Sequence, residues 1–282
     1  MQQGFQLVCG DKCLDLSQPR VMGILNVTPD SFSDGGRFAN LEPACRHADS
    51  LVSEGASIID IGGESTRPGA AEVSVQHELD RVIPLVEYVS AHHDVWISVD
   101  TSKPEVMSEA VAAGAHLIND VRALQEPGAL AVAAKLNVPV CLMHMQGQPR
   151  TMQDAPVYQD IIGDISAFFE ERIEACLDAG ITRDNLLLDP GFGFGKTLSH
   201  NYELLNRQAE LKAFGLPLLI GLSRKSMIGN LLNVPPSERL AGSLSAALLS
   251  IQQGAHIIRV HDVKPTMDMI KVMQACANYQ AL

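Results

Sequence analysis

The sequence predicts a (β/α)8 barrel, in which eight parallel strands close into a cylinder surrounded by helices. Eight short runs of apolar, mostly branched residues recur along the chain, and each precedes a stretch with helical character. These runs are continuously apolar, which is typical of parallel strands buried on both faces. Together they indicate one TIM-barrel domain over residues 1–282. The predicted strands are residues 21–27, 57–62, 95–100, 116–121, 138–144, 185–189, 217–223 and 257–262.

A short antiparallel β-hairpin is predicted ahead of the first barrel strand. Residues 5–8 and 13–16 are strand-like segments, and Gly10 and Asp11 between them suit a tight turn. We expect this hairpin to cover the bottom of the barrel, where the strands begin.

Three similar segments mark places where a helix ends and a strand begins. Each contains a Gly-Ala pair followed by an apolar run, and their glycines are Gly55, Gly114 and Gly254. A glycine at this position takes the left-handed conformation that ends a helix. A polar residue follows each glycine by five positions, and we expect these residues at equivalent heights in the barrel: Asp60, Asn119 and Arg259.

Polar residues also end most of the other predicted strands. Active sites of (β/α)8 enzymes lie at the carboxyl ends of the strands, so this pattern predicts a site there. The alternative is a structural role in capping or inter-strand hydrogen bonds, which we favour for Asp60, Asp120 and His144 because buried polar groups are usually satisfied structurally. The strand-end residues are Asn26, Asp100, His144, Asp189, Ser223 and His261.

The composition excludes several kinds of partner. The chain of 282 residues has a net charge of −12, so we expect no binding of nucleic acid. No run approaches the roughly 18 apolar residues of a membrane span, and residues 1–10 lack the pattern of a signal peptide. The six cysteines show no CxxC spacing. We therefore expect reduced thiols and a cytoplasmic protein without membrane partners.

A glycine-rich segment at residues 191–197 has some features of a nucleotide-binding loop. A P-loop requires a glycine five residues before Gly195, but that position is Pro190. The GxGxxG pattern also fails, because Lys196 stands in place of its third glycine. Lys196 is therefore expected to be a solvated surface charge.

Four segments resemble the signatures of one enzyme family. Residues 26–36 and 62–69 form two polar loops, residues 187–194 surround an aspartate, and residues 223–226 form a lysine motif. In this order they are similar to the dihydropteroate synthases, the folate-pathway enzymes that sulfonamides block. The resemblance covers about residues 21–264. It implies a homodimeric enzyme that condenses 6-hydroxymethyl-7,8-dihydropterin diphosphate with p-aminobenzoate to give 7,8-dihydropteroate and pyrophosphate.

The resemblance implies a pterin site whose residues have suitable chemistry. Carboxylates offer acceptors only, an amide offers both donor and acceptor, and lysine and arginine offer donors. A pterin edge carries adjacent N–H donors and a carbonyl, while its flat ring can stack on a guanidinium. A structural salt bridge is the alternative for each residue. The implied pterin ligands are Asp100, Asn119, Asp189, Lys225 and Arg259.

A pyrophosphate site with Mg²⁺ is also implied by the resemblance. Asn26 would be the magnesium ligand through its amide oxygen, which suits an ion that keeps several waters and takes other ligands from substrate phosphates. For His261, the alternative is a structural pair with Asp262. The implied pyrophosphate contacts are Asn26, Arg67, Arg259 and His261.

The resemblance places p-aminobenzoate in a pocket beside the pterin. Ser226 is expected to open a helix, whose N-terminus would attract the substrate carboxylate. Phe32 lies among Asp, Ser and Gly, where no core is expected. The implied pocket residues are Phe32, Thr66, Pro68, Phe194 and Ser226.

The implied chemistry is a dissociative substitution. Departure of pyrophosphate leaves a cation delocalised into the dihydropterin ring, and residues 27–37 and 65–70 are expected to close over it and exclude water. Asp34 is a candidate to stabilise the cation or accept the late proton. Catalytic roles are assigned to Asp34, Arg67, Lys225 and His261.

Three alternatives share parts of this pattern. A corrinoid-linked methyltransferase has the barrel and the pterin site, but no use for residues 26–36. A catalytically silent pterin-binding homologue would not need four residues that are intact here, Asn26, Arg67, Lys225 and His261. A Schiff-base aldolase using Lys225 would need a lowered lysine pKa, which a nearby Asp189 is expected to oppose.

Overall fold

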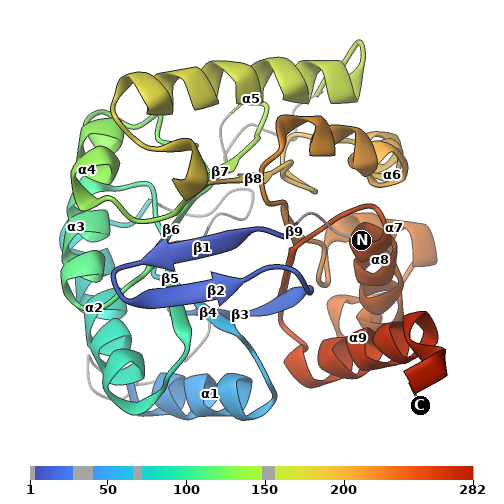
Figure 1. Cartoon of the computed structure of the whole chain (residues 1–282), viewed down its shortest axis with the longest axis horizontal. Coiled ribbons are helices and arrows are strands. Elements are labelled where there is room, and N and C mark those ends of the chain that lie inside the picture. The colour runs from blue at the N-terminus through green and yellow to red at the C-terminus, as the bar shows by residue number, and fades with distance from the viewer. Residues whose placement is uncertain (1–3, 28–40, 66–71, 148–155, 282) are drawn as a thin grey trace.

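The computed structural model describes residues 4–27, 41–65, 72–147 and 156–281. Eight parallel strands form a barrel in the order β8-β7-β6-β5-β4-β3-β10-β9, and an isolated bridge between Leu188 and Leu218 joins the two outer strands (Figure 1). The predicted (β/α)8 barrel is thus confirmed. Its strands are β3 (Arg20–Asn26), β4 (Ile58–Gly62), β5 (Trp96–Asp100), β6 (Leu117–Asp120), β7 (Val140–Met143), β8 (Leu186–Asp189), β9 (Leu219–Gly221) and β10 (Ile257–Val260).

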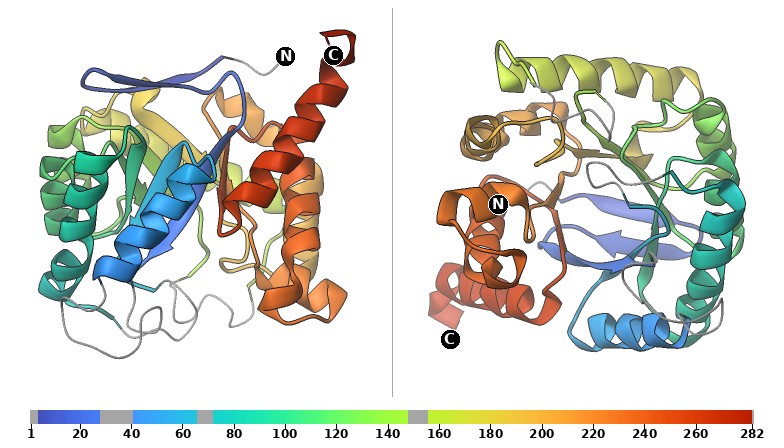
Figure 2. Two further views of the ribbon diagram at one scale, coloured as in Figure 1. Left: turned by 90° about the horizontal axis from the view of Figure 1, so that it is seen from below. Right: turned by 180° about the vertical axis from the view of Figure 1, so that it is seen from behind.

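Helices surround the barrel and cover the outer face of its sheet, as Figures 1 and 2 show. This arrangement buries each strand on both sides, which explains the continuously apolar runs. Short 3-10 helices add to the ring at Arg183–Asn185, Gln208–Phe214, Pro236–Glu238 and Tyr279–Ala281. The α-helices are α1 (Leu41–Ser53), α2 (Val75–His92), α3 (Pro104–Ala112), α4 (Ala129–Leu136), α5 (Ile161–Asp178), α6 (Leu198–Arg207), α7 (Ser226–Leu232), α8 (Leu240–Gln252) and α9 (Val263–Ala277).

The three repeat glycines all have the predicted left-handed conformation. Gly55, Gly114 and Gly254 have φ angles of 104°, 116° and 101°. At Gly114 a side chain would also lack space, because an added Cβ would lie 2.5 Å from Ser90 Oγ. Each of these helices therefore ends where the sequence predicts, one turn before a barrel strand.

The N-terminal hairpin lies across one end of the barrel (Figure 2, left). Its strands β1 (Gln6–Cys9) and β2 (Lys12–Asp15) pair antiparallel, with Leu7 opposite Leu14. The hairpin is confirmed, with each strand shifted by one residue from its predicted bounds.

The interior of the barrel at this end is an apolar layer that we call the bottom layer. Leu7, Leu14 and Leu16 of the hairpin pack against one buried side chain from every barrel strand. The hairpin thus closes the bottom of the barrel, as predicted. The strand residues of the bottom layer are Met22, Ile58, Trp96, Leu117, Cys141, Leu187, Leu219 and Ile257.

A second and larger apolar core fills the space between the sheet and the helices. All six cysteines are free thiols, in agreement with the predicted reduced state, and three of them are buried. Within the described ranges, no helix has the length and apolar character needed to cross a bilayer.

Candidate active site

The next interior layer of the barrel has polar side chains on five of its strands, and we call it the polar layer. Side chains on one face of a strand recur every second residue. The residues two positions beyond the bottom layer therefore share its face but lie closer to the carboxyl ends of the strands. Among them are Asp60, Ser98, Asn119, Asp189 and Arg259.

Asp60 joins several members of the polar layer. Its carboxylate accepts hydrogen bonds from Ser98 Oγ at 2.6 Å, Asn119 Nδ2 at 3.2 Å and Arg259 Nε at 2.6 Å. The side chains predicted to lie at equivalent heights are therefore in contact. Asp60 has the structural role favoured from the sequence, since it orients Asn119 and Arg259.

Arg259 lies between two carboxylates. Its Nη2 donates to Asp100 Oδ2 at 2.8 Å, while Nε binds Asp60. Burial alone would lower the pKa of Arg259, but Asp60 and Asp100 outweigh it and raise the pKa. Burial raises the pKa of Asp100 to about 7, although Arg259 acts in the opposite direction. The guanidinium is therefore charged and fixed in orientation by two partners.

Asp189 ends β8 and begins a turn. Its Oδ1 accepts a hydrogen bond from Gly191 N at 2.8 Å, and the residue is 5% exposed. Burial raises the pKa of this carboxyl, and the charge of Lys225 opposes that rise. Burying a carboxylate is unfavourable unless hydrogen-bond donors compensate for the lost water.

Lys225 lies against the glycine-rich turn that follows Asp189. Its Nζ donates to Phe192 O and lies 4.7 Å from the centre of the Phe194 ring. Burial lowers the pKa of Lys225 to about 8, although Asp189 acts to raise it. The argument that Asp189 would prevent a lowered lysine pKa is therefore wrong, because the desolvation of Lys225 is the larger effect.

Lys196 is buried, and the expectation of a solvated surface charge is wrong. The residue is 3% exposed, and its Nζ lies 2.9 Å from Gly191 O and 3.0 Å from His144 Nδ1. The physical reason is the path of the glycine-rich segment. Gly191, with a φ of 69°, turns the chain so tightly that an added Cβ would collide with His144 O. The segment therefore folds over the end of β7 and covers the lysine.

Asn26 and His261 lie at the mouth of the barrel. A Cβ built on Gly62 would lie 3.3 Å from Asn26 Oδ1 and 3.4 Å from Asp100 Cβ, so these side chains share the space above Gly62. His261 Nδ1 lies 3.0 Å from Ser223 Oγ. Asp262, the partner of His261 in the structural alternative, accepts from Arg224 Nε at 2.9 Å.

Ser226 is the first residue of α7, as expected, and it is exposed. Lys225 precedes it as the N-cap residue. Several expected site residues lie outside the described residues, and so do most of the two loops expected to close over the substrates. These residues are Phe32, Asp34, Thr66, Arg67 and Pro68.

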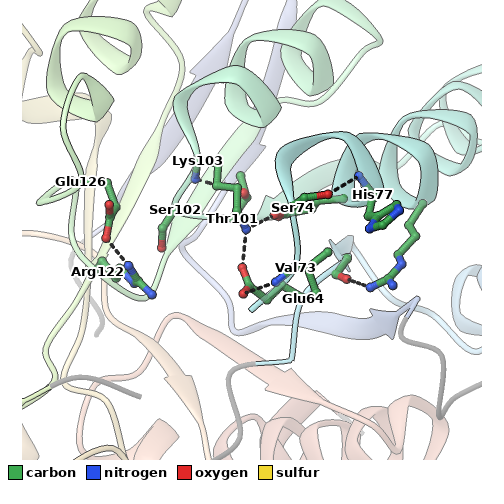
Figure 3. A network of polar contacts seen from close by, with 12 residues as sticks. Glu64, Val73, Ser74, His77, Thr101, Ser102, Lys103, Arg122 and Glu126 are labelled. Atoms are coloured by element: carbon green, nitrogen blue, oxygen red, sulfur yellow. Dashed lines mark hydrogen bonds and ion pairs between the residues drawn. The ribbon is translucent and has the colours of Figure 1, made fainter. Parts of the chain in front are cut away.

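A partly buried ion cluster that the sequence analysis did not identify lies beside the mouth (Figure 3). Lys103 Nζ donates to Glu64 and, at 2.5 Å, to Glu78 Oε2. Glu64 Oε1 also accepts from Val73 N at 3.1 Å. Burial alone would lower the pKa of Lys103, but the two glutamates outweigh it and raise the pKa. The cluster joins the ends of β4 and β5 to the first turn of α2.

Glu78 is the most buried member of this cluster, since its side chain is 1% exposed. Within the described residues, its Oε1 has no hydrogen-bond partner. Glu78 stands in the first turn of a helix, where a glutamate is ordinarily a solvated group that interacts with the helix dipole. Its sequence context therefore gave no signal of burial.

Metal binding by protein groups alone is not indicated where the chain is described. In these ranges, no three His, Cys, Asp or Glu side chains are placed to hold a metal ion. The hard oxygen ligands at the mouth are Asn26 Oδ1 and the nearby carboxylate of Asp100. This set fits an ion such as Mg²⁺ that takes its remaining ligands from water and a bound substrate.

Comparisons with known proteins agree with this geometry. A family model described as pterin binding enzyme matches residues 22–261. The dihydropteroate synthase of Escherichia coli (strain K12) is 63% identical over 262 residues, which are 93% of each chain. The Yersinia pestis dihydropteroate synthase, solved in a sulfonamide drug complex, has a TM-score of 0.93 and 60% identity and covers 97% of this chain and 99% of its own. The Xanthomonas albilineans enzyme, solved with 4-aminobenzoic acid, has a TM-score of 0.92 and 52% identity, with 98% and 99% covered.

The family model identifies this parallel barrel, with its acceptors and donors at the carboxyl end, as a pterin-binding enzyme. The chain belongs to the dihydropteroate synthase family and is a transferase of folate biosynthesis. The methyltransferase, the silent homologue and the aldolase are therefore not retained.

Proposed function

We propose that the mouth of the barrel is the place where the chain condenses 6-hydroxymethyl-7,8-dihydropterin diphosphate with p-aminobenzoate. The observation that carries this proposal is the polar layer. In this layer the buried acceptor Asp189 lies with the donor Arg259 and beside Lys225. The buried acceptor Asp100, two residues beyond Ser98 on β5, binds Arg259 from the end of its strand. The edge of a pterin, with adjacent N–H donors and a carbonyl, complements such a set.

The pterin contacts can be assigned to particular atoms. Asp189 Oδ1 already accepts a hydrogen bond from Gly191 N, so we assign Oδ2 to the pterin N–H donors. Asn119 donates through Nδ2 to Asp60, which leaves Oδ1 as the atom for a further pterin donor. With a pKa of about 8, Lys225 is mostly protonated at neutral pH and donates to the pterin carbonyl. Arg259 offers the plane on which the ring stacks.

The pyrophosphate is assigned to the rim of the mouth. Asn26 and His261 lie there with Arg259, and Arg67 completes the expected set outside the described residues. Asn26 Oδ1 would hold Mg²⁺, which would neutralise charge on the leaving group. The residues Arg259 and His261 donate to the phosphate oxygens and so stabilise the charge that grows as the bond breaks.

The p-aminobenzoate pocket is assigned next to Lys225. Phe194 supplies one wall, since its ring lies against the Lys225 amine. Ser226, exposed at the start of α7, is the proposed contact of the substrate carboxylate. The 4-aminobenzoic acid in the Xanthomonas albilineans relative supports this choice of substrate. Phe32, Thr66 and Pro68 remain proposed pocket residues.

The proposed course is dissociative. The C–O bond to pyrophosphate breaks first and leaves a cation spread over the dihydropterin, to which the arylamine nitrogen adds before it loses a proton. An arylamine is uncharged at neutral pH, so its attack requires no strong base. The buried carboxylates Asp100 and Asp189 favour the cation electrostatically, and Asp34 remains the proposed acceptor of the proton.

Three further properties belong to this proposal. Sulfonamides would compete with p-aminobenzoate, in keeping with the drug complex of the Yersinia pestis relative. A cytoplasmic location suits the exposed free thiols Cys13 and Cys276. A homodimer suits the exposed leucines on and next to α7 and α8, which are Leu231, Leu232, Leu240 and Leu249.

Release of pyrophosphate tests the reaction directly. With Mg²⁺ present, we expect release only when the pterin diphosphate and p-aminobenzoate are both supplied, and a sulfonamide should raise the apparent KM for p-aminobenzoate without lowering kcat. Release at the same rate without p-aminobenzoate would instead identify a hydrolase. Asn26→Ala should raise the Mg²⁺ concentration needed for half-maximal rate while leaving affinity for a pterin without phosphates unchanged.

A further inference from the structure

A buried lysine binds the backbone of the glycine-rich turn that follows β8. Lys196 Nζ lies 2.9 Å from Gly191 O, 3.1 Å from Phe194 O and 3.0 Å from His144 Nδ1. An ammonium has three N–H donors. In the protonated form of Lys196, each donor therefore has one partner, and the partners are two backbone carbonyls and the ring nitrogen of His144.

The histidine is suited to the part of acceptor. Burial lowers the pKa of His144 to about 2, and the charge of Lys196 acts in the same direction. His144 is therefore neutral, and its Nδ1 can accept when the ring proton is on Nε2. Burial also lowers the pKa of Lys196, whereas Asp189 acts to raise it. This contact agrees with the structural role that the sequence analysis favoured for His144.

The two carbonyls that Lys196 binds bracket the part of the turn that touches Lys225. Phe192 O accepts from Lys225 Nζ, and the Phe194 ring lies 4.7 Å from the same atom. Both of these residues belong to the segment 191–194, whose first and last carbonyls bind Lys196. A displacement of either carbonyl would therefore move the groups that position the Lys225 amine.

Two further side chains bind the backbone of the same turn. Asn201 Oδ1 accepts from Gly193 N at 2.7 Å, and Tyr158 donates from its hydroxyl to Gly195 O at 2.8 Å. These residues come from α6 and from the segment before α5. Lys196 differs from them because it binds two carbonyls of the turn at once.

We propose that Lys196 is a positioning residue, which rests on His144 and fixes the turn so that Phe192 and Phe194 hold the Lys225 amine in its pterin-binding orientation. This inference rests on the function proposed for the barrel mouth. Lys196 itself touches neither substrate. It acts through the turn. Its loss would therefore change the position of the Lys225 amine but would remove no group that binds the substrates.

Lys196→Met tests the inference, because methionine keeps the volume but has no donor. Lys135→Met, an exposed lysine in the last turn of α4, is the matched control. We expect kcat/KM per folded molecule to fall by about 100-fold, the effect typical of a displacement near 1 Å. Affinity for a pterin analogue, measured by calorimetry, should fall as well. The control should match the wild type in both.

A purely structural role would give a different result. In that case Lys196→Met would lower the melting temperature, yet the kinetic constants of the folded fraction would remain those of the wild type, and the inference would be overturned. A wild-type protein that releases no pyrophosphate with both substrates would instead reject the proposed function.

Chemical rescue distinguishes the lost donors from a general loss of packing. In Lys196→Ala, propylamine should restore activity because its ammonium offers three donors, whereas propanol, of similar size, offers one and should not. Equal rescue by both would contradict the inference. If neither lysine variant folds, Tyr158→Phe removes only the hydroxyl bond to Gly195 O. It should lower kcat/KM several-fold in the same direction, and an unchanged value would count against positioning by the turn.

Discussion

At the bottom of the barrel, one apolar side chain from each of the eight strands packs against the hairpin, whereas the positions two residues further along five of these strands carry polar side chains. Leu187 and Asp189 show the change within a single strand, β8. The two layers share the same backbone, the same period and nearly complete burial. They differ only in the chemistry of the side chains.

This difference separates stability from function along the barrel axis. Burial of apolar side chains in the bottom layer stabilises the fold. Burial of carboxylates toward the carboxyl ends of the strands is unfavourable, and the raised pKa values of Asp100 and Asp189 express that cost. Groups held in this state gain most from a ligand that supplies the missing hydrogen bonds.

The largest effect on stability is expected at the bottom. Leu187→Ala removes a fully buried side chain and should lower the free energy of unfolding by about 2–5 kcal/mol. Denaturant unfolding measures this change. Affinity of the folded fraction for a pterin analogue should remain that of the wild type. A large loss of affinity would show that the two layers are not separable.

Lys103→Met tests whether the top of the barrel also contributes stability. Removal of this lysine leaves Glu78 buried and without its cation, which should cost about 3 kcal/mol. Lys12→Met is the control at the bottom, since Lys12 pairs at 3.0 Å with Asp94, which is 98% exposed. Such a surface pair contributes at most about 1 kcal/mol. If both variants lost the same free energy of unfolding, the ion cluster would stabilise the fold no more than a surface pair does.

Asp189→Asn sharpens the comparison within β8. The amide places a donor against the N–H donors of the pterin, so affinity should fall by about 2 kcal/mol, roughly 30-fold. Stability should not fall, because the neutral side chain removes a desolvated charge and its oxygen can still accept from Gly191 N. Calorimetry with a pterin analogue and denaturant unfolding check the two parts. Unchanged affinity would remove Asp189 from the site.

A pH dependence of stability is also expected, from Asp100. Its pKa is raised from 3.8 to about 7 in the folded protein. Between these values the folded state binds the proton more tightly than the unfolded chain, so this group makes the protein less stable as the pH rises from about 4 to 7. The free energy of unfolding of Asp100→Asn, relative to the wild type, should therefore increase across this range. A constant difference would contradict the raised pKa.

The sequence was sufficient for the barrel because its signals are local. A continuous apolar run, a glycine at a helix end and a turn dipeptide each act within a few residues, and Gly55, Gly114 and Gly254 have the expected positive φ angles. The positions of Asp60 and Arg259 at one height followed from the same repeat. Their hydrogen bond joins residues 199 positions apart.

The burial of Lys196 and the ion pairs of Lys103 could not be predicted in the same way. Lys196 is covered because Gly191 packs on the backbone of His144, from a different loop. Lys103 meets Glu78 across 25 residues, and the first turn of a helix gives no sign that its glutamate is buried. Their burial depends on how loops pack on each other, which has no periodic signature in the sequence.

The bridge between Leu188 and Leu218 has a consequence for how the molecule opens. Elsewhere neighbouring strands are joined by ladders of three or more residue pairs, but β8 meets β9 through this bridge and a hydrogen bond from Leu188 N to Pro217 O. The barrel thus has a seam, and local unfolding begins where the fewest hydrogen bonds must break. Amide exchange in β9 should be faster than in β4 or β5. The seam runs beside Asp189 and the turn that holds Lys225. Local opening between β8 and β9 would therefore occur next to the proposed pterin site.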